Sequence, residues 1–231
     1  KKRNLVLCVF VLLFDYSFSQ VGIGTTNPTA GLDVDGTLRV RSTPGLVNGK
    51  HLVVDKHGNV GVNNNYNLIL MPTTVAPSPK VYVSNTKNSF TENNINLGLI
   101  QSVTIPSNKQ AKVIVTYSMP LGTKTNNVDI DGYIGVRFLK DGVEKEAGSR
   151  KYNLNEISGS TYQMSTLTSI FTEEIITGNT DLTIEYSLDG YIEQYSTSKN
   201  VSYIFNMWSS SPPNYNWGRA VLSIQVFAKE I

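Results

Sequence analysis

The chain has 231 residues, of which 40% are hydrophobic and 16% are charged, and its formal net charge is +2 at pH 7. This low and nearly balanced charge excludes the electrostatic footprint that binding to DNA or RNA requires. The single cysteine, Cys8, excludes a framework of intrachain disulfides. The length allows one or two domains with a substantial hydrophobic core.

The N-terminus is predicted to be a secretory signal. The basic residues 1–3 precede an apolar run, Leu5–Phe14, which is shorter than the roughly 20 residues that span a membrane. Ser17 and Ser19 fit the small residues of a cleavage site, so we expect the mature chain to begin at Gln20. The protein is then extracellular or on the outer cell surface, with no membrane insertion after the signal is removed.

Removal of residues 1–19 also changes the charge and the thiol content. The segment contains Cys8, three of the 20 basic residues and one of the 18 acidic residues, so the remaining chain is formally neutral. We therefore expect no thiol nucleophile and no nucleic-acid partner in the mature protein.

The rest of the chain is predicted to be all-β. Dipeptides that favour tight hairpin turns separate β-rich segments, namely Asp35-Gly36, Asn48-Gly49, Asp141-Gly142 and Asp189-Gly190. Apolar and polar residues alternate over Leu182–Leu188, as they do in a half-buried strand. The same alternation occurs at Ile134, Val136 and Phe138, and again at Leu222, Ile224 and Val226.

Composition divides the mature chain into three parts. An Asn-rich patch at 63–67 is followed by Pro72, Pro77 and Pro79, and clustered prolines favour an extended connector. We predict a small fibre-like β module at 20–65, a Pro-rich linker at 66–80 and a larger β module at 81–231.

The glycines of the first module do not match a nucleotide-binding loop. Gly22 and Gly24 lack the third glycine of a dinucleotide fingerprint, because Asn27 and Pro28 stand where that glycine and a helix are needed. We expect the two glycines to permit unusual φ angles or close approach of backbones, and we expect no cofactor.

The first module is too small to bury its own apolar residues. Val21–Asn27 is echoed by Val60–Asn65, and both Leu32–Val40 and His51–Val60 are typical of a strand, a turn and a second strand. A repeat unit of this size needs neighbours to complete a core. The missing contacts must come from the larger module or from other chains.

The motif VGIGTTNP…LDVDGTLRV, from Val21 onward, resembles a segment common in secreted proteins of Bacteroidetes and in phage tail fibres, and Leu52–Val62 resembles a frequent follower. The resemblance implies trimeric, fibre-like β structure ahead of a globular tip. The chain differs from long fibre proteins in having few repeats and no recognisable C-terminal chaperone or autoprotease segment.

The larger module resembles the jelly-roll heads of the tumour necrosis factor and complement type. Ala111–Pro120, Tyr133–Gly142 and Gly218–Phe227 resemble an early core strand, a strand with its hairpin turn, and the final central strand of such a head. The resemblance implies a jelly-roll-like antiparallel β-sandwich that forms a homotrimer, which agrees with the needs of the first module.

Residues suited to catalysis or metal binding are few. His51 and His57 are the only histidines and both lie in the small module, so the larger module cannot form a Ser-His-Asp triad. Two carboxylate pairs could serve glycoside cleavage or keep exposed strands soluble, Glu144 with Glu146 and Glu173 with Glu174. Two further pairs could bind calcium or form hairpin turns, Asp33 with Asp35 and Asp129 with Asp131.

The most distinctive segment is Tyr203–Arg219, which contains both tryptophans. Aromatic and amide side chains on an exposed loop could stack on sugar rings and bind their hydroxyls. The candidate ligand-binding residues are Tyr215, Trp217, Asn214, Asn216, Arg219 and Trp208. In the alternative interpretation the two tryptophans plug the sandwich and Arg219 pairs internally.

These features predict a secreted or surface-exposed structural or adhesive protein that has no enzymatic activity and consists of a trimeric stalk and a sandwich head. The alternatives are a carbohydrate-binding module that recognises a surface glycan and a glycan-active hydrolase. A surface glycan or a protein is the expected ligand of the head.

Overall fold

The computed structural model describes residues 20–38, 52–62, 65–124, 129–155, 162–210, 213–214 and 218–231, with the backbone alone at 209–210 and 213–214. The predicted signal at 1–19 lies outside these residues. The described residues form strands and contain no helix, so the prediction of an all-β chain is confirmed. They accordingly include no helix able to cross a membrane. The chain divides into two compact units, residues 1–53 and 54–231.

In the first unit, β1 (Val21–Ile23) and β2 (Leu32–Val34) pair in parallel. The amide of Asp35 extends this ladder by donating to the carbonyl of Ile23 at 2.8 Å. Gly24 has a φ of 79°, and a Cβ at this position would lie 2.3 Å from the carbonyl oxygen of Asp35. The expectation that this glycine permits an unusual φ and a close backbone approach is confirmed.

A second small ladder joins β3 (Leu52–Val54) to β4 (Val60–Val62), as the expected strand, turn and strand. The Asp55 carboxylate holds the turn between them. It accepts hydrogen bonds from the side-chain amide of Asn59 at 2.9 Å and from the backbone amides of Asn59 and His57 at 2.9 and 2.8 Å, and these bonds, that of the Asn59 side chain most, lower its pKa.

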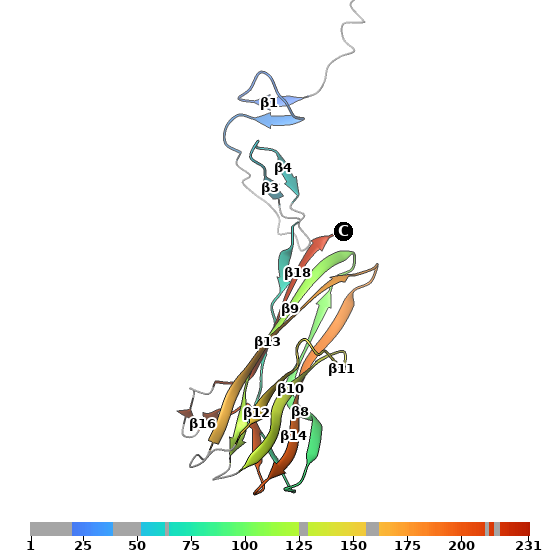
Figure 1. The fold of residues 1–231 in the computed structure, drawn as a ribbon. Coiled ribbons are helices and arrows are strands. Elements are labelled where there is room, and N and C mark those ends of the chain that lie inside the picture. Colours follow the sequence, from blue (N-terminus) through green and yellow to red (C-terminus); the bar gives the residue numbers. More distant parts are fainter. Residues whose placement is uncertain are drawn as a thin grey trace, which may run out of the picture. The chain divides into compact units, whose positions relative to one another are not determined.

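The head consists of two antiparallel sheets that lie face to face (Figure 1). The five-stranded sheet has the order β11-β10-β14-β8, with β12 also paired to β10. Its strands are β8 (Phe90–Ile105), β10 (Ile130–Lys140), β11 (Val143–Glu144), β12 (Arg150–Leu154) and β14 (Leu182–Thr197).

The seven-stranded sheet has the order β5-β18-β9-β15-β7, with β13 paired to β9 and β6 paired to β18. Its strands are β5 (Asn67–Leu70), β6 (Thr73–Val75), β7 (Lys80–Val83), β9 (Lys109–Lys124), β13 (Tyr162–Ile176), β15 (Ser202–Phe205) and β18 (Val221–Glu230). A short separate ladder pairs β16 (Ser209–Ser210) with β17 (Pro213–Asn214).

The core lies between the two sheets and is built by the alternation that the sequence shows. Inward residues of the two sheets are almost fully buried, among them Ile134, Val136, Phe138, Ile184, Tyr186, Leu188, Leu222, Ile224 and Val226. The rings of Phe138 and Phe171 pack with their centroids 4.9 Å apart, and Phe138 also stacks with Tyr186 at 6.0 Å. The three alternating segments identified in the sequence are therefore confirmed as half-buried strands, and the head is a jelly-roll-like sandwich.

The predicted linker at 66–80 is not a connector. β5 and β6 pair with β18, and β7 begins at Lys80, so this segment contributes strands to the seven-stranded sheet. Ala76 is fully buried in the core and its amide donates to the carbonyl of Ala220 at 2.9 Å. Pro72 and Pro77 lie just outside β6, where a missing amide removes no ladder hydrogen bond.

Two of the Asp-Gly dipeptides have different roles. Asp141 and Gly142, with φ of 50° and 75°, form the predicted tight turn between β10 and β11. The prediction of a turn at Asp189-Gly190 is wrong, because these residues lie inside β14 where its register with β8 shifts. Gly190 is needed there for packing, since a Cβ would lie 2.9 Å from the ring of Phe205.

Candidate functional site

The predicted ligand segment begins with a break in the strand rather than its continuation. β15 ends at Phe205, and Asn206 has a φ of 58°, so Trp208 lies beyond the strand. The side chain of Asn206 accepts a hydrogen bond from the amide of Ala220 at 2.7 Å. Residues 206 and 220 thereby hold the two ends of the segment together.

Arg219 pairs internally, as the alternative interpretation proposed. Its guanidinium carbon lies 4.4 Å from the centroid of the Trp208 ring. Its Nη2 donates to the carbonyl oxygens of Ala76 and Pro77 at 2.8 and 3.1 Å. These contacts use the planar guanidinium to fasten the segment to the start of the head, and they occupy one face of the Trp208 ring.

The remaining predicted ligand residues cannot be placed in this arrangement. Tyr215, Asn216 and Trp217 lie outside the described residues, and Asn214 is described only by its backbone pairing with Ser209 in the β16–β17 ladder.

A hollow of about 390 Å³ lies beside Trp208, and we call it the Trp208 hollow. The indole Nε1 of Trp208 is buried and has no hydrogen-bond partner among the residues that the structure describes. The ring of Tyr162 faces the Nζ of Lys124 at 5.6 Å. The hollow is lined by Pro79, Val81, Lys124, Tyr162, Ser202, Ile204, Met207 and Trp208.

The candidate metal ligands do not form a cluster. Asp129 and Asp131 flank the start of β10, and the amide of Ser198 donates to the carbonyl of Asp129 at 3.2 Å. In the part of the chain that the structure describes, no three His, Cys, Asp or Glu side chains are close enough to hold a metal ion together. Asp33 instead accepts hydrogen bonds from the amide and hydroxyl of Thr29 at 2.8 and 3.0 Å.

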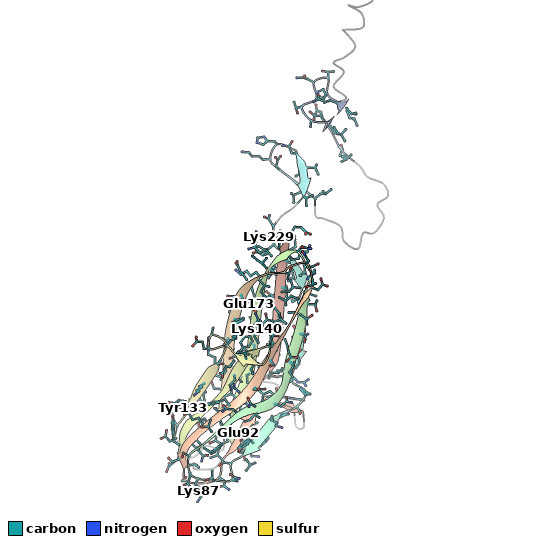
Figure 2. The ribbon with its side chains drawn as sticks, turned by 90° about the vertical axis from the view of Figure 1, so that its right-hand side faces the viewer. Lys87, Glu92, Tyr133, Lys140, Glu173 and Lys229 are labelled. Carbon is teal, nitrogen blue, oxygen red and sulfur yellow. The ribbon has the colours of Figure 1, made fainter. Side chains whose placement is uncertain are left out.

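One carboxylate of each candidate catalytic pair, Glu173 and Glu144, is engaged in structural contacts. Glu173 pairs with Lys140, beside which it lies in Figure 2, and accepts a hydrogen bond from the hydroxyl of Tyr186. Glu144 pairs with the Nε of Arg137 at 2.8 Å and accepts a hydrogen bond from Ser149 at 2.8 Å. Burial raises the pKa of Glu144, but these hydrogen bonds outweigh it and lower the pKa overall. A general acid at neutral pH needs the opposite shift.

A polar cluster on the outer face of the five-stranded sheet offers a better candidate site. We call it the tyrosine cluster, and its members are Tyr133 on β10, Lys151 on β12, and Tyr191, Glu193 and Tyr195 on β14. The three β14 residues are two positions apart and therefore project from the same face. Figure 2 shows Tyr133 on the outside of the sandwich, toward the end of the head that carries Lys87.

Glu193 is the centre of the hydrogen bonds in this cluster. Lys151 Nζ and the Tyr191 hydroxyl donate to its Oε2 at 2.8 and 2.6 Å, and the Tyr195 hydroxyl donates to its Oε1 at 2.9 Å. These three hydrogen bonds lower the pKa of Glu193 to about 2. Glu193 is therefore a fixed anion at neutral pH.

The rings are arranged around Lys151. Its Nζ lies 4.3 Å from the Tyr191 ring centroid and 5.6 Å from that of Tyr133, within the range of cation–π attraction. Tyr133 and Tyr195 meet edge to face at 6.0 Å. Burial lowers the pKa of Lys151, but its hydrogen bonds to Glu193 and Tyr191 outweigh this and raise the pKa overall.

A groove of about 340 Å³ continues from Tyr191 along the same sheet, and we call it the polar groove. Arg137 is held in it by the ion pair with Glu144 and by a hydrogen bond to the side-chain oxygen of Asn94. Arg150 donates to the carbonyls of Ala147 and Ser149 at 3.0 and 2.7 Å. The groove is lined by Asn93, Val136, Arg137, Glu144, Glu146, Ser149, Arg150, Lys151 and Tyr191.

The tyrosine cluster is difficult to recognise in the sequence for a specific reason. The outward alternation Tyr191, Glu193, Tyr195 was a readable signal, but assigning Asp189-Gly190 to a turn ended the preceding strand at Leu188. The segment after the dipeptide was therefore not recognised as part of the same strand.

No protein-family model and no curated protein matches this chain. Among solved structures, that of infectious bursal disease virus Gx strain is 12% identical, with a TM-score of 0.30, over 84% of this chain and 46% of that chain. A family 35 carbohydrate binding module from Clostridium thermocellum is 10% identical, with a TM-score of 0.20, over 59% of this chain and 97% of that chain. This chain therefore spans about half the viral chain.

A third similar structure is dimeric latent PorU from Porphyromonas gingivalis, 10% identical with a TM-score of 0.21, over 55% of this chain and 12% of that chain. TM-scores this far below 0.5 do not establish a shared fold. The assignment of a β-sandwich to this chain depends on its own strand pairing and core.

Proposed function

We propose that this protein is a secreted or surface-exposed structural and adhesive protein, without catalytic activity, whose N-terminal segments assemble with other copies and whose sandwich head binds a ligand. The proposed assembly is a homotrimer with a short stalk. The motif resemblance described above supports three chains over two.

The observation that carries this proposal is the exposure of apolar residues in the N-terminal ladders. No described residue in 20–38 or 52–62 is buried. Nine large aliphatic side chains are exposed there, namely Val21, Ile23, Leu32, Leu38, Leu52, Val53, Val54, Val60 and Val62. Burying one such side chain contributes about 1.5–3 kcal/mol, so covering this set by other copies gives a large driving force for assembly.

The mass of the chain in solution tests the assembly. A protein starting at Gln20 should scatter light with three times the single-chain mass at micromolar concentration. Replacing Val60 and Val62 with Lys should shift the mass toward that of one chain, because burying an unpaired lysine charge between copies costs free energy. Val143→Lys, at an exposed aliphatic residue of the β10–β11 hairpin, is the matched control and should leave the mass unchanged.

A single-chain mass for the unmodified protein would contradict the assembly. A mass that falls equally in the Val143→Lys control would place the contacts on the head instead of the N-terminal ladders.

Export is tested separately by intact-mass analysis of protein recovered from a secreting host. The expected mass begins at Gln20, with or without cyclisation of that residue. Secreted material that retains residues 1–19 would contradict the predicted cleavage, and absence of export would contradict the proposed location.

The alternative function, a carbohydrate-binding module, is favoured by the tyrosine cluster and the polar groove. Ordered tyrosine rings beside fixed hydrogen-bonding groups are the components of a ligand site. This function is compatible with the stalk, since an adhesive head needs a ligand.

A further inference from the structure

We propose that the polar groove and the adjoining tyrosine cluster form one binding site for a neutral saccharide. The inference depends on the proposed binding role of the head and moves the site from the Tyr203–Arg219 segment to the outer face of the five-stranded sheet. Tyr191 and Lys151 belong to both features, which makes the surface continuous.

At the centre of this site β10 carries a glycine instead of a side chain. Gly135 lies in register with Lys151 on one side and Tyr191 on the other. A Cβ at Gly135 would lie 2.4 Å from the carbonyl oxygen of Arg150, so no side chain can fill this position. The side chains of the two flanking strands meet across it, with Lys151 Nζ 3.1 Å from the Tyr191 hydroxyl.

The tyrosine rings offer apolar surface at the edge of the groove. Tyr195 is 47% exposed although its hydroxyl is hydrogen-bonded to Glu193. A core role is excluded for its ring, because Ile192 and Gln194 are the residues of β14 that face inward here. A sugar ring has an apolar face edged by hydroxyls, and an aromatic ring with a polar tip matches both parts.

The charges favour a neutral ligand over an anion. The three cations of the groove, Arg137, Arg150 and Lys151, are balanced by Glu144, Glu146 and the adjoining Glu193. A phosphate or nucleic-acid site would carry an excess of positive charge. The site holds both hydrogen-bond donors and hydrogen-bond acceptors in fixed positions. This combination suits the hydroxyl groups of a sugar, because each hydroxyl can donate and accept a hydrogen bond.

The site is also organised before any ligand arrives. Its side chains project from paired strands, and the hydroxyls of Tyr191 and Tyr195 are already held by Glu193. Little conformational entropy is then lost when a ligand orders these rings. The Tyr203–Arg219 segment offers less open aromatic surface to a sugar ring, because Arg219 covers one face of Trp208.

A printed array of neutral oligosaccharides of glucose, galactose, mannose and xylose, with acidic oligosaccharides alongside, tests the ligand class. The protein is the chain from Gln20. We expect binding to neutral members, followed by calorimetric titration with the best of them. Binding to no array member, or to acidic members alone, would overturn the proposal.

Variants locate the site. Lys151→Met and Tyr195→Ala should each weaken binding of that oligosaccharide at least about tenfold. Tyr162→Ala and Lys124→Met, on the Trp208 hollow, are the matched controls and should change binding less than about twofold. Circular dichroism melting shows that each variant is folded. The opposite pattern, with loss only in the hollow variants, would place the ligand at Trp208 and overturn the proposal.

The outcome is separable from that of the proposed assembly. A single-chain protein that binds through Lys151 and Tyr195 would retain the saccharide site and contradict the stalk. A trimer that binds no oligosaccharide would retain the stalk and contradict the site.

Discussion

Glu193 illustrates how a surface carboxylate can become part of the folded state. Three donors from two strands converge on it, and its pKa falls from the ordinary 4.5 to about 2. A lowered folded-state pKa means that the contribution to stability is complete above the unfolded value of 4.5. That contribution is lost as the pH falls through the folded value of about 2.

The first prediction follows from this window. Between pH 5 and pH 2 the free energy of unfolding should fall less steeply for Glu193→Gln than for the unmodified chain, because the variant has no carboxylate to protonate. Urea unfolding at several pH values measures it. Glu174→Gln, at an exposed carboxylate on β13, is the control and should retain the slope of the unmodified chain. If the free energy of unfolding depended on pH equally for Glu193→Gln and the unmodified chain, the lowered pKa of Glu193 would be contradicted.

At the scale of an element, the β10–β11 hairpin depends on two left-handed residues. Gly142 has a φ of 75°, which a residue with a Cβ adopts at a cost of about 1–2 kcal/mol. The side chain of Asp141, the other turn residue, accepts a hydrogen bond from the amide of Glu185 at 2.9 Å. The turn is thus fixed both by backbone conformation and by a contact to β14.

The second prediction compares two glycines. Gly142→Ala should lower the free energy of unfolding by about 1–2 kcal/mol. Gly178→Ala, outside the left-handed region and with open space around its Cβ, should change it by less than about 0.5 kcal/mol. Chemical denaturation of both variants provides the comparison. Equal destabilisation would show that loss of a glycine, and not the φ at 142, determines the effect.

The strands of the head were predictable where each side faces a different environment. Ile184, Tyr186 and Leu188 alternate with polar residues because one face meets the core and the other meets water. The strands at 66–80 could not be predicted in this way. Prolines lie next to the ends of these strands, and clustered prolines are more typical of a linker. The tyrosine cluster was not predicted because Asp189-Gly190 is typical of a turn. Gly190 instead lies inside a strand, where the absence of a side chain allows close packing.

The third prediction concerns the 66–80 segment as a structural part of the sheet. The amide of Ala76, buried and bonded to Ala220, should exchange with deuterium only on global unfolding. Lys56, in the exposed turn between β3 and β4, should exchange within the dead time of the experiment. Hydrogen exchange followed by mass spectrometry or NMR distinguishes them. Fast exchange at Ala76 would instead support the prediction that 66–80 is a linker.

At the scale of the whole molecule, the N-terminal ladders and the head obtain stability from different sources. The head has its own core, in which Phe138, Tyr186 and Leu222 are buried. The ladders at 20–38 and 52–62 have no buried residue of their own. If copies of the chain cover those ladders, their stability depends on protein concentration, whereas that of the head need not.

The last prediction is therefore that heating gives two calorimetric transitions with different concentration dependence. The transition of the N-terminal ladders should move to higher temperature by a few degrees when the protein concentration rises tenfold, since association stabilises by mass action. The head transition should stay in place, and it should persist in Val60→Lys/Val62→Lys, which loses only the first transition. A head transition that moves with concentration would put trimer contacts on the sandwich itself, because only elements that contact other copies respond to dilution.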